Sequence, residues 1–317
     1  MIQSIIVLDS KKAKNITSAQ LPDVKGKFVW IDVENPTADD FVFLKKHFSL
    51  HPLACDTVFD SSLRPKVVEF DKHLLIVFHE PDPEDKGLNF NRIDFFVGEN
   101  FLITSHKESV AAIDTVKATL DSNPGIMKNG PAFLTHNILD NVVESYFPVL
   151  DAMDSSTDEL EDRIFLKDHD VSLKEIFSLK KQVLELRKKI GPEREVLTML
   201  SRHELSFVDK NSTIYFRDVY DHLLRISEML DIYRDLLTGI LDVYVSVQSN
   251  KLNEVMKVLT VIATIILPLT FITGFYGMNI VFPELEFFGV NSYFFIFFLM
   301  ALLVMVMVFY FKKRKWL

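Results

Sequence analysis

The sequence predicts an N-terminal α/β domain, a set of long helices and two membrane-spanning helices near the C-terminal end. Three observations predict it. Short β-prone runs separated by turn residues fill about the first 110 residues, and a helix-rich stretch with few glycines and prolines follows to about residue 250. Two apolar runs without charge then occupy residues 258–276 and 293–311. Each has about 19 residues, which at ~1.5 Å per residue crosses a hydrocarbon core of ~30 Å.

Residues 1–130 are predicted to form the α/β domain. Their β-prone runs are rich in β-branched and aromatic residues and are bounded by proline, glycine and asparagine. Thr37 is expected to cap a helix that runs through Phe48, with Asp40 at the capping-box position. The runs cover residues 5–8, 28–31, 74–78, 93–97 and 101–103.

Histidine and cysteine give little support for a metal centre in this domain. His47 and His51 are four residues apart, but Pro52 disfavours helical geometry at His51, so two ordinary histidines are expected there. Cys55 is the only cysteine, which excludes a disulfide or a multi-thiolate metal cage within one chain.

Residues 131–213 are predicted to form an acidic pair of helices and a connector. The segment 151–189 has the charge pattern of two solvated helices around a turn near 167–171. Gly191-Pro192 is expected to break the second helix, with a shorter helix following to about Glu204.

A single long helix is predicted from Ile214 to Tyr276, because Pro268 is the only proline in this stretch. About 60 residues of helix extend close to 90 Å. Residues 214–257 are assigned to a stalk outside the membrane, and residues 258–276 to the first span. Such a helix needs partners, either from its own chain or from other copies of it.

Charge predicts the orientation in the membrane. Basic residues flank the spans on one side only, at Lys251, Lys257 and the tail 312–317, whereas the connector 277–292 has none and carries Glu284 and Glu286. The positive-inside rule places both termini in the cytoplasm and the connector outside. The N-terminus also lacks the basic-then-apolar order of a signal peptide.

Composition and motifs exclude several classes of function. The net charge is −12 before Lys251 and +3 from there on, so the extramembrane part is too acidic to favour nucleic acid as a partner. No glycine-rich phosphate loop of the GxxxxGK[ST] kind occurs, and no nucleophile–base signature indicates an enzyme.

Small and polar residues recur on one face of the long helix at steps of three and four. Two interpretations are open: a tight helix–helix contact, or the wall of a water-filled pore built by several copies with cyclic symmetry. In the second, the same residue from every copy forms a ring around the axis. The ring would consist of carboxylates at Asp242, of amides at Asn253 and of apolar side chains at Met256 and Leu267. The predicted pore-lining residues are Asp242, Asn253, Met256, Thr260, Ala263, Leu267, Thr270 and Gly274.

The first span ends in Tyr276-Gly277-Met278-Asn279, and Pro283-Glu284-Leu285 follows. Together with the basic end 312–315 and the segments 51–53, 64–66, 215–222 and 249–257, this resembles the CorA family of magnesium channels over nearly the whole chain. The resemblance implies a funnel-shaped homopentamer in the plasma membrane, with an α/β domain, acidic paired helices and a stalk helix that continues as the pore lining.

The resemblance also implies the cargo. It assigns the selectivity filter to Gly277, Met278 and Asn279, and passive Mg²⁺ influx, with Co²⁺ and Ni²⁺ as further ions, to the assembly. Mg²⁺ gives up its water reluctantly, and amide oxygens of Asn279 can accept hydrogen bonds from that water without removing it. Glu284 and Glu286 are expected to concentrate cations at the outer mouth.

Regulation by cytoplasmic Mg²⁺ is implied in the same way. By resemblance, Asp218 matches the regulatory aspartate of the stalk, and Asp56 and Asp140 match further acidic positions at the contact between copies. The sequence departs from the family in two places. Thr57 follows Asp56 where the family usually has a second acid, which implies a sensor that is weaker or holds fewer ions, and Phe282 replaces a methionine.

Two alternatives stay open on sequence alone. One is a transporter of zinc or another divalent ion with the same fold, since relatives with other ion preferences share the Gly-Met-Asn triplet. The other is a membrane-anchored ion sensor or scaffold without a pore, against which the small polar stripe argues.

Overall fold

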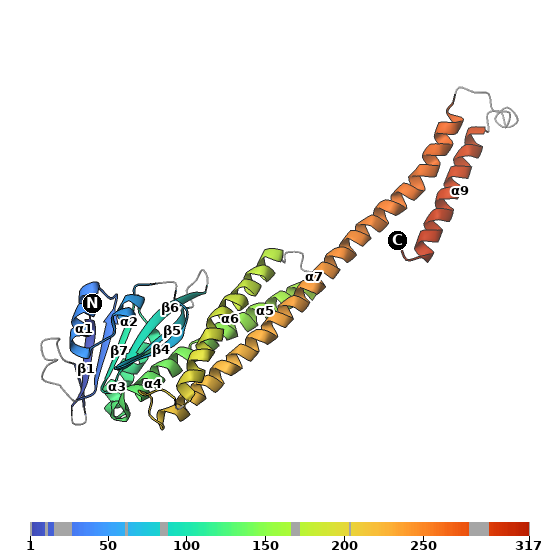
Figure 1. Ribbon diagram of the computed structural model, residues 1–317. Coiled ribbons are helices and arrows are strands. Elements are labelled where there is room, and N and C mark those ends of the chain that lie inside the picture. Colours follow the sequence, from blue (N-terminus) through green and yellow to red (C-terminus); the bar gives the residue numbers. More distant parts are fainter. Residues whose placement is uncertain are drawn as a thin grey trace. The chain divides into compact units, whose positions relative to one another are not determined.

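A computed structural model of the chain describes residues 2–9, 12–15, 27–60, 63–82, 88–165, 172–202, 204–278 and 292–316. The chain divides into two compact units, Met1–Ile240 and Leu241–Leu317. Figure 1 shows a sheet and several helices in the first unit, and the end of one long helix together with a second helix in the other.

The first unit is built on a sheet with the strand order β2-β1-β3-β7-β6-β5-β4. Among the strand pairs that the structure describes, only β3–β7 is parallel. The five predicted strands are confirmed, while β2 and β4 were missed because one is short and polar and the other is a short, half-exposed edge. The strands are β1 (Ile2–Asp9), β2 (Lys12–Asn15), β3 (Val29–Glu34), β4 (Lys66–Phe70), β5 (His73–Asp82), β6 (Asn89–Val97) and β7 (Phe101–His106).

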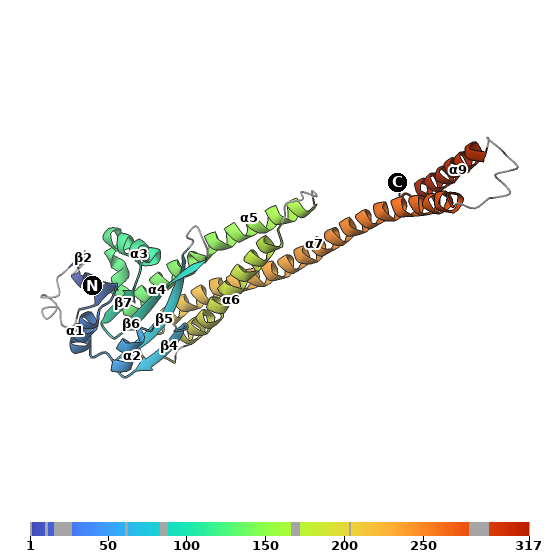
Figure 2. The same ribbon diagram turned by 90° about the horizontal axis from the view of Figure 1, so that it is seen from above.

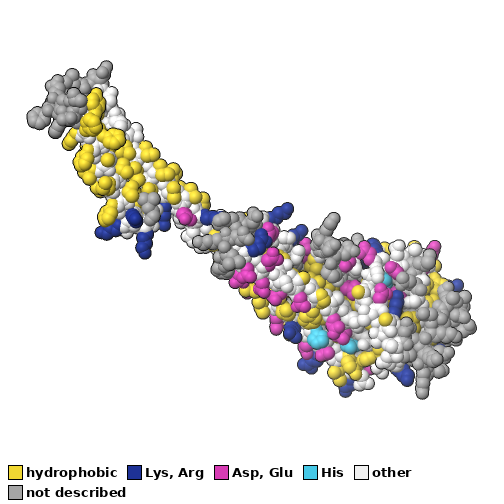
Figure 3. All heavy atoms as spheres, turned by 180° about the vertical axis from the view of Figure 1, so that it is seen from behind, with side chains coloured by type: hydrophobic (Ala, Val, Ile, Leu, Met, Phe, Trp, Pro, Cys, Tyr) yellow, Lys and Arg dark blue, Asp and Glu magenta, His cyan; other side chains and the backbone are white. Residues whose placement is uncertain are grey.

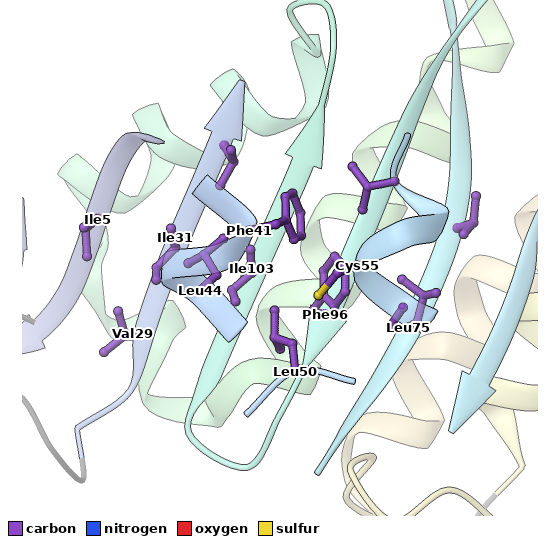
Figure 4. Close-up of a cluster of buried hydrophobic side chains, with 14 of the residues drawn as sticks. Ile5, Val29, Ile31, Phe41, Leu44, Leu50, Cys55, Leu75, Phe96 and Ile103 are labelled. Atoms are coloured by element: carbon purple, nitrogen blue, oxygen red, sulfur yellow. The ribbon is translucent and has the colours of Figure 1, made fainter. Parts of the chain in front are cut away.

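Helices α1 (Ala38–Phe48) and α2 (Pro52–Thr57) cover one face of this sheet. The predicted capping box of α1 is confirmed, since the Thr37 side chain accepts from Asp40 N–H and the Asp40 carboxylate accepts from Thr37 N–H. His51 caps α2 with extended backbone, as the following proline predicts. Figure 4 shows the core on this face, where Phe41 and Leu44 of α1 meet Ile31, Phe96 and Ile103.

The opposite face packs against α3 (Ala111–Ser122), a short 3₁₀ helix η2 (Pro124–Asn129) and α4 (Gly130–Glu144). Buried side chains of α4, including Leu134, Ile138 and Leu139, contribute to this second core layer. The helices that follow α4 along the chain contain the strongly charged segment 151–189.

The predicted acidic pair is confirmed as α5 (Tyr146–Phe165) and α6 (Leu173–Ser201), and the expected turn at 167–171 lies outside the described residues. The predicted break at Gly191-Pro192 is wrong, because α6 continues through Pro192. Ile190, Glu193, Val196 and Leu197 are all buried around it. Their packing outweighs the ~3 kcal/mol that an interior proline costs a helix.

The predicted long helix is confirmed as α7 (Ser212–Tyr276), which crosses the boundary between the units. In the second unit, its apolar end is accompanied by α9 (Ser292–Lys313). Figures 1 and 2 show these two segments side by side. Both are long and apolar enough to cross a membrane, and very little of either apolar window is buried. Figure 3 shows hydrophobic side chains over this pair, with basic residues at one end.

Candidate ion path and regulatory site

The stripe predicted on the long helix is exposed along its whole length in α7. Every one of the eight predicted pore-lining residues is exposed: Asp242, Asn253, Met256, Thr260, Ala263, Leu267, Thr270 and Gly274. At 100° per residue, these positions fall on one side of the helix. The structure therefore brings the predicted residues into one continuous surface that the chain itself leaves open.

The best-covered positions lie on the opposite side of α7. Val261 is buried, with 5% of its surface exposed, and Ile265, Pro268 and Ile272 are half-buried. These residues recur at helical spacing, and α9 is the other described helix of the second unit. The second helix consequently shields one face of α7 from its surroundings and leaves the stripe for contact with water or with other copies.

Threonine hydroxyls give the stripe hydrogen-bond acceptors. Thr260 Oγ1 donates to the Met256 carbonyl at 2.7 Å, and Thr270 Oγ1 donates to the Ile266 carbonyl at 3.0 Å. Each hydroxyl donates its one hydrogen to a carbonyl of the same helix, so the lone pairs of its oxygen remain available as acceptors. Acceptors are what the water shell of a cation requires, because its hydrogens point outward.

Two of the predicted filter residues, Gly277 and Met278, follow directly from the end of α7. Gly277 N–H donates to the Thr273 carbonyl at 2.9 Å, and Met278 N–H donates to the Phe275 carbonyl at 3.3 Å. A Cβ at position 277 would meet the Thr273 carbonyl oxygen at 2.7 Å, so this close approach requires glycine. Asn279, Glu284 and Glu286 lie outside the described residues.

Two helices bring the predicted regulatory aspartates Asp140 and Asp218 together. Asp140 is on α4 and Asp218 on α7, and the charge of Asp218 acts on Asp140. Burial first, and then the charges of Glu144 and Asp218, raise the pKa of Asp140. A carboxyl group whose pKa is raised in this way gains from any cation that comes near it.

Two histidines complete this cluster, and sequence reasoning missed both. His222 Nδ1 lies 3.8 Å from Asp140 Oδ1, and both atoms are buried without a hydrogen-bond partner among the described residues. His136 is buried, and this burial lowers its pKa to about 4 against the opposing charge of Asp218. The signal was present: each helix carries one histidine and one aspartate four residues apart, which is one helix face.

The third predicted regulatory residue, Asp56, is not part of this cluster. It is exposed on α2. Among the described residues of one chain, no group of three or more histidine, cysteine, aspartate or glutamate side chains is arranged to hold a metal ion.

Comparisons with known proteins agree with this architecture. The model of the family described as "CorA-like Mg2+ transporter protein" matches residues 25–313. The cobalt/magnesium transport protein CorA of Thermotoga maritima is 36% identical over 91% of this chain and 83% of its own. The cobalt/magnesium transport protein CorA of Methanocaldococcus jannaschii is 26% identical over 99% and 100%. The solved structure of CorA magnesium transporter from Methanocaldococcus jannaschii superposes with a TM-score of 0.87 at 24% identity, over 100% of this chain and 99% of that one.

The architecture, an α/β unit followed by a long helix with two apolar spans at the C-terminal end, is that of a membrane transport protein. The match of the family model over most of the chain makes the assignment specific. The chain belongs to the CorA-like Mg²⁺ transporter family, as its sequence resemblance indicated.

Proposed function

We propose that five copies of this chain surround a common axis in the plasma membrane and pass hydrated Mg²⁺ into the cytoplasm, with Co²⁺ and Ni²⁺ as further ions. The observation that carries the proposal is the polar stripe of α7, which is exposed and faces away from the side that α9 accompanies. Two apolar helices cannot enclose water, so the path requires several copies, each of which contributes its stripe to a ring.

The membrane potential supplies the driving force. A potential of ~100 mV, negative inside, favours entry of a divalent cation by about 4.6 kcal/mol, twice the ~2.3 kcal/mol per charge. The basic residues that flank the spans support an orientation with both termini on the cytoplasmic side, by the positive-inside rule. Ions therefore enter between the external connectors and leave beside Asp242.

Selectivity is assigned to Gly277, Met278 and Asn279 at the outer end of α7, with Glu284 and Glu286 attracting cations to the entrance. An amide ring holds the water shell of Mg²⁺ by hydrogen bonds, whereas a carboxylate ring would bind the ion more tightly and slow its release.

Regulation is assigned to cytoplasmic Mg²⁺ held between copies by Asp140 and Asp218 of one chain and Asp56 of its neighbour. The residues fit a cation: the buried Asp140 Oδ1 has no hydrogen-bond partner among the described residues, and Asp56 is exposed for contact with another chain. Bound Mg²⁺ offsets the repulsion of these carboxylates and favours the closed assembly.

The pore wall is tested by cysteine accessibility in proteoliposomes. Cys55→Ala removes the only cysteine, and Thr270→Cys or Ile262→Cys is then introduced. Both positions are exposed in the single chain, but Ile262 is off the stripe. A cationic thiol reagent is expected to block Mg²⁺ uptake through Thr270→Cys and to leave Ile262→Cys active. Equal block of the two variants, or block of neither, would contradict the assignment.

The filter is tested by Asn279→Ala in the same proteoliposomes. We expect Mg²⁺ uptake to fall because the ring loses the oxygens that hold the water shell. Addition of Zn²⁺ in a parallel series distinguishes the zinc alternative, since a zinc transporter would take up Zn²⁺ in preference to Mg²⁺. Uptake by Asn279→Ala at the wild-type rate would refute the role of this residue.

A further inference from the structure

A cavity of about 390 Å³ lies in the first unit, apart from the proposed ion path and the regulatory aspartates. The side chains of His79, Arg92, Asp94 and Ser105 reach it from β5, β6 and β7. Strand register puts these four on one face of the sheet, because His79 pairs with Arg92 and Asp94 with Ser105. This is the face that carries α1 and α2. Lys189 of α6 forms another wall.

Cations dominate the charge of this cavity. The guanidinium of Arg92 donates to Asp94 Oδ1 at 2.6 and 3.0 Å and to the Thr57 carbonyl at 2.9 Å, so Asp94 is already neutralised. Lys107 and Lys189 also line the cavity and form no ion pair among the described residues. The remaining acid, Glu108, is exposed.

The histidine in the wall adds no charge to the cavity. Burial first, and then the positive charges of Lys189 and Arg92, lower the pKa of His79 to about 3. Its ring is therefore neutral at physiological pH and has one N–H to donate.

Two buried polar atoms in the wall make no hydrogen bond among the described residues, although Glu193 Oε1 lies 3.8 Å from one of them, His79 Nδ1. Ser105 is fully buried, and its Oγ makes no hydrogen bond among the described residues. His79 is 3% exposed, and its Nδ1 is also without a hydrogen bond there. Buried polar atoms are nearly always satisfied, and each one that is not calls for a ligand or a bound water.

We propose that this cavity binds a small oxyanion of the phosphate-ester or polycarboxylate class. Lys189 Nζ, Lys107 Nζ and the Ser105 hydroxyl are donors suited to such oxygens. The volume is within the range of small-molecule sites, about 300–1,000 Å³. The Phe90 ring, 5.2 Å from Lys189 Nζ, adds an apolar wall for the remainder of the ligand. Because Lys189 belongs to α6, the bound anion joins the acidic helix pair to the sheet.

Calorimetric titration of the full chain in detergent, without Mg²⁺ and at constant ionic strength, tests this site. Pyrophosphate and citrate are separate titrants, and chloride is the reference. We expect one saturable site per chain for at least one titrant, and the stronger of the two identifies the phosphate or the carboxylate class. Lys189→Met and Ser105→Ala are each expected to weaken binding by about tenfold, the loss of one charge-assisted hydrogen bond.

Lys188→Met is the matched control, since this neighbour on α6 is exposed and does not line the cavity. Lys107→Met is a second test variant, because this lining residue is exposed and lies outside the buried core. Absence of saturable binding for both titrants, or equal weakening by Lys188→Met and Lys189→Met, would overturn the proposal. Neither result bears on ion transport, so the two hypotheses fail separately.

Discussion

A single buried carboxylate, Asp32, organises the polar interior of the α/β unit. Its side chain is fully buried and accepts from Thr104 Oγ1 at 2.5 Å, Lys117 Nζ at 2.7 Å and His106 Nε2 at 3.1 Å. Trp30 Nε1 donates in turn to Thr104 Oγ1 at 3.1 Å. Satisfied networks of this kind fix a core uniquely, and removal of one member leaves the others unpaired.

The network has a definite pH dependence. Burial alone would lower the pKa of His106, but the hydrogen bond and charge of Asp32 outweigh it and the pKa is raised. Burial likewise opposes ionisation of Asp32, yet His106 and Lys117 leave its pKa lowered. The stabilisation from His106 is therefore complete below its ordinary pKa of about 6.5 and is lost as pH rises through the raised value. That from Asp32 is lost as pH falls through the lowered value.

Replacement of Asp32 tests this network. Asp32→Asn should lower the free energy of unfolding by about 3 kcal/mol, as expected for a broken buried pair. It should also flatten the loss of stability above pH 6.5. Denaturant unfolding followed by Trp30 fluorescence in a Trp316→Phe background measures both effects. Asp114→Asn is the control, because this carboxylate also approaches Lys117, at 3.8 Å, but is exposed. Equal effects of the two substitutions would refute the buried-network account.

At the scale of elements, helix α6 supplies a hydrogen-bond acceptor to the part of strand β5 that β4 does not pair with. β4 pairs with β5 only as far as Val77. Beyond that point His79 N–H donates to Glu193 Oε1 at 3.2 Å, and Tyr146 O–H donates to Glu193 Oε2 at 2.8 Å. Glu193 is fully buried next to Pro192, and burial raises its pKa to about 8. This contact helps to explain why the helix continues through the proline.

Glu193→Gln tests this contact through its pH dependence. The folded pKa of Glu193 is above its ordinary value, so the wild type loses stability as pH rises from about 4.5 to about 8 and no further beyond it. Glutamine keeps the acceptor and does not ionise. The free energy of unfolding of the variant should equal that of the wild type near pH 5. At pH 8 it should be higher than that of the wild type by several kcal/mol. Glu195→Gln, a glutamate on the same helix that shows no comparable burial, is the control. If the free energies of unfolding of Glu193→Gln and the wild type differ by the same amount across this pH range, the buried carboxyl group of Glu193 is not neutral.

The sequence predicts an element well where local interactions stabilise it, and poorly where contacts between distant parts of the chain do. The capping box of Thr37 and the proline-free run before Pro268 are local signals, and both α1 and α7 were predicted. The α6 helix depends on contacts with β5 and α5 that are distant in sequence, so the local rule for Pro192 failed. The stripe on α7 was predicted because its period is local, whereas the pairing of Asp140 with His222 between two helices was not.

At the scale of the whole molecule, the proposed gating belongs to the assembly, because the proposed sensor needs Asp56 from another copy. Asp218→Asn removes one carboxylate per contact between copies. The binding free energy of Mg²⁺ at that contact is therefore expected to become less favourable. The concentration of cytoplasmic-side Mg²⁺ that halves uptake should rise by about tenfold, equivalent to ~1.4 kcal/mol at each contact. Proteoliposome uptake at graded internal Mg²⁺ measures it, with Asp235→Asn, an exposed aspartate on α7 paired with Arg234, as the control. If Asp218→Asn retains the inhibition curve of the wild type while Asp56→Asn shifts it, the sensor does not include the stalk aspartate.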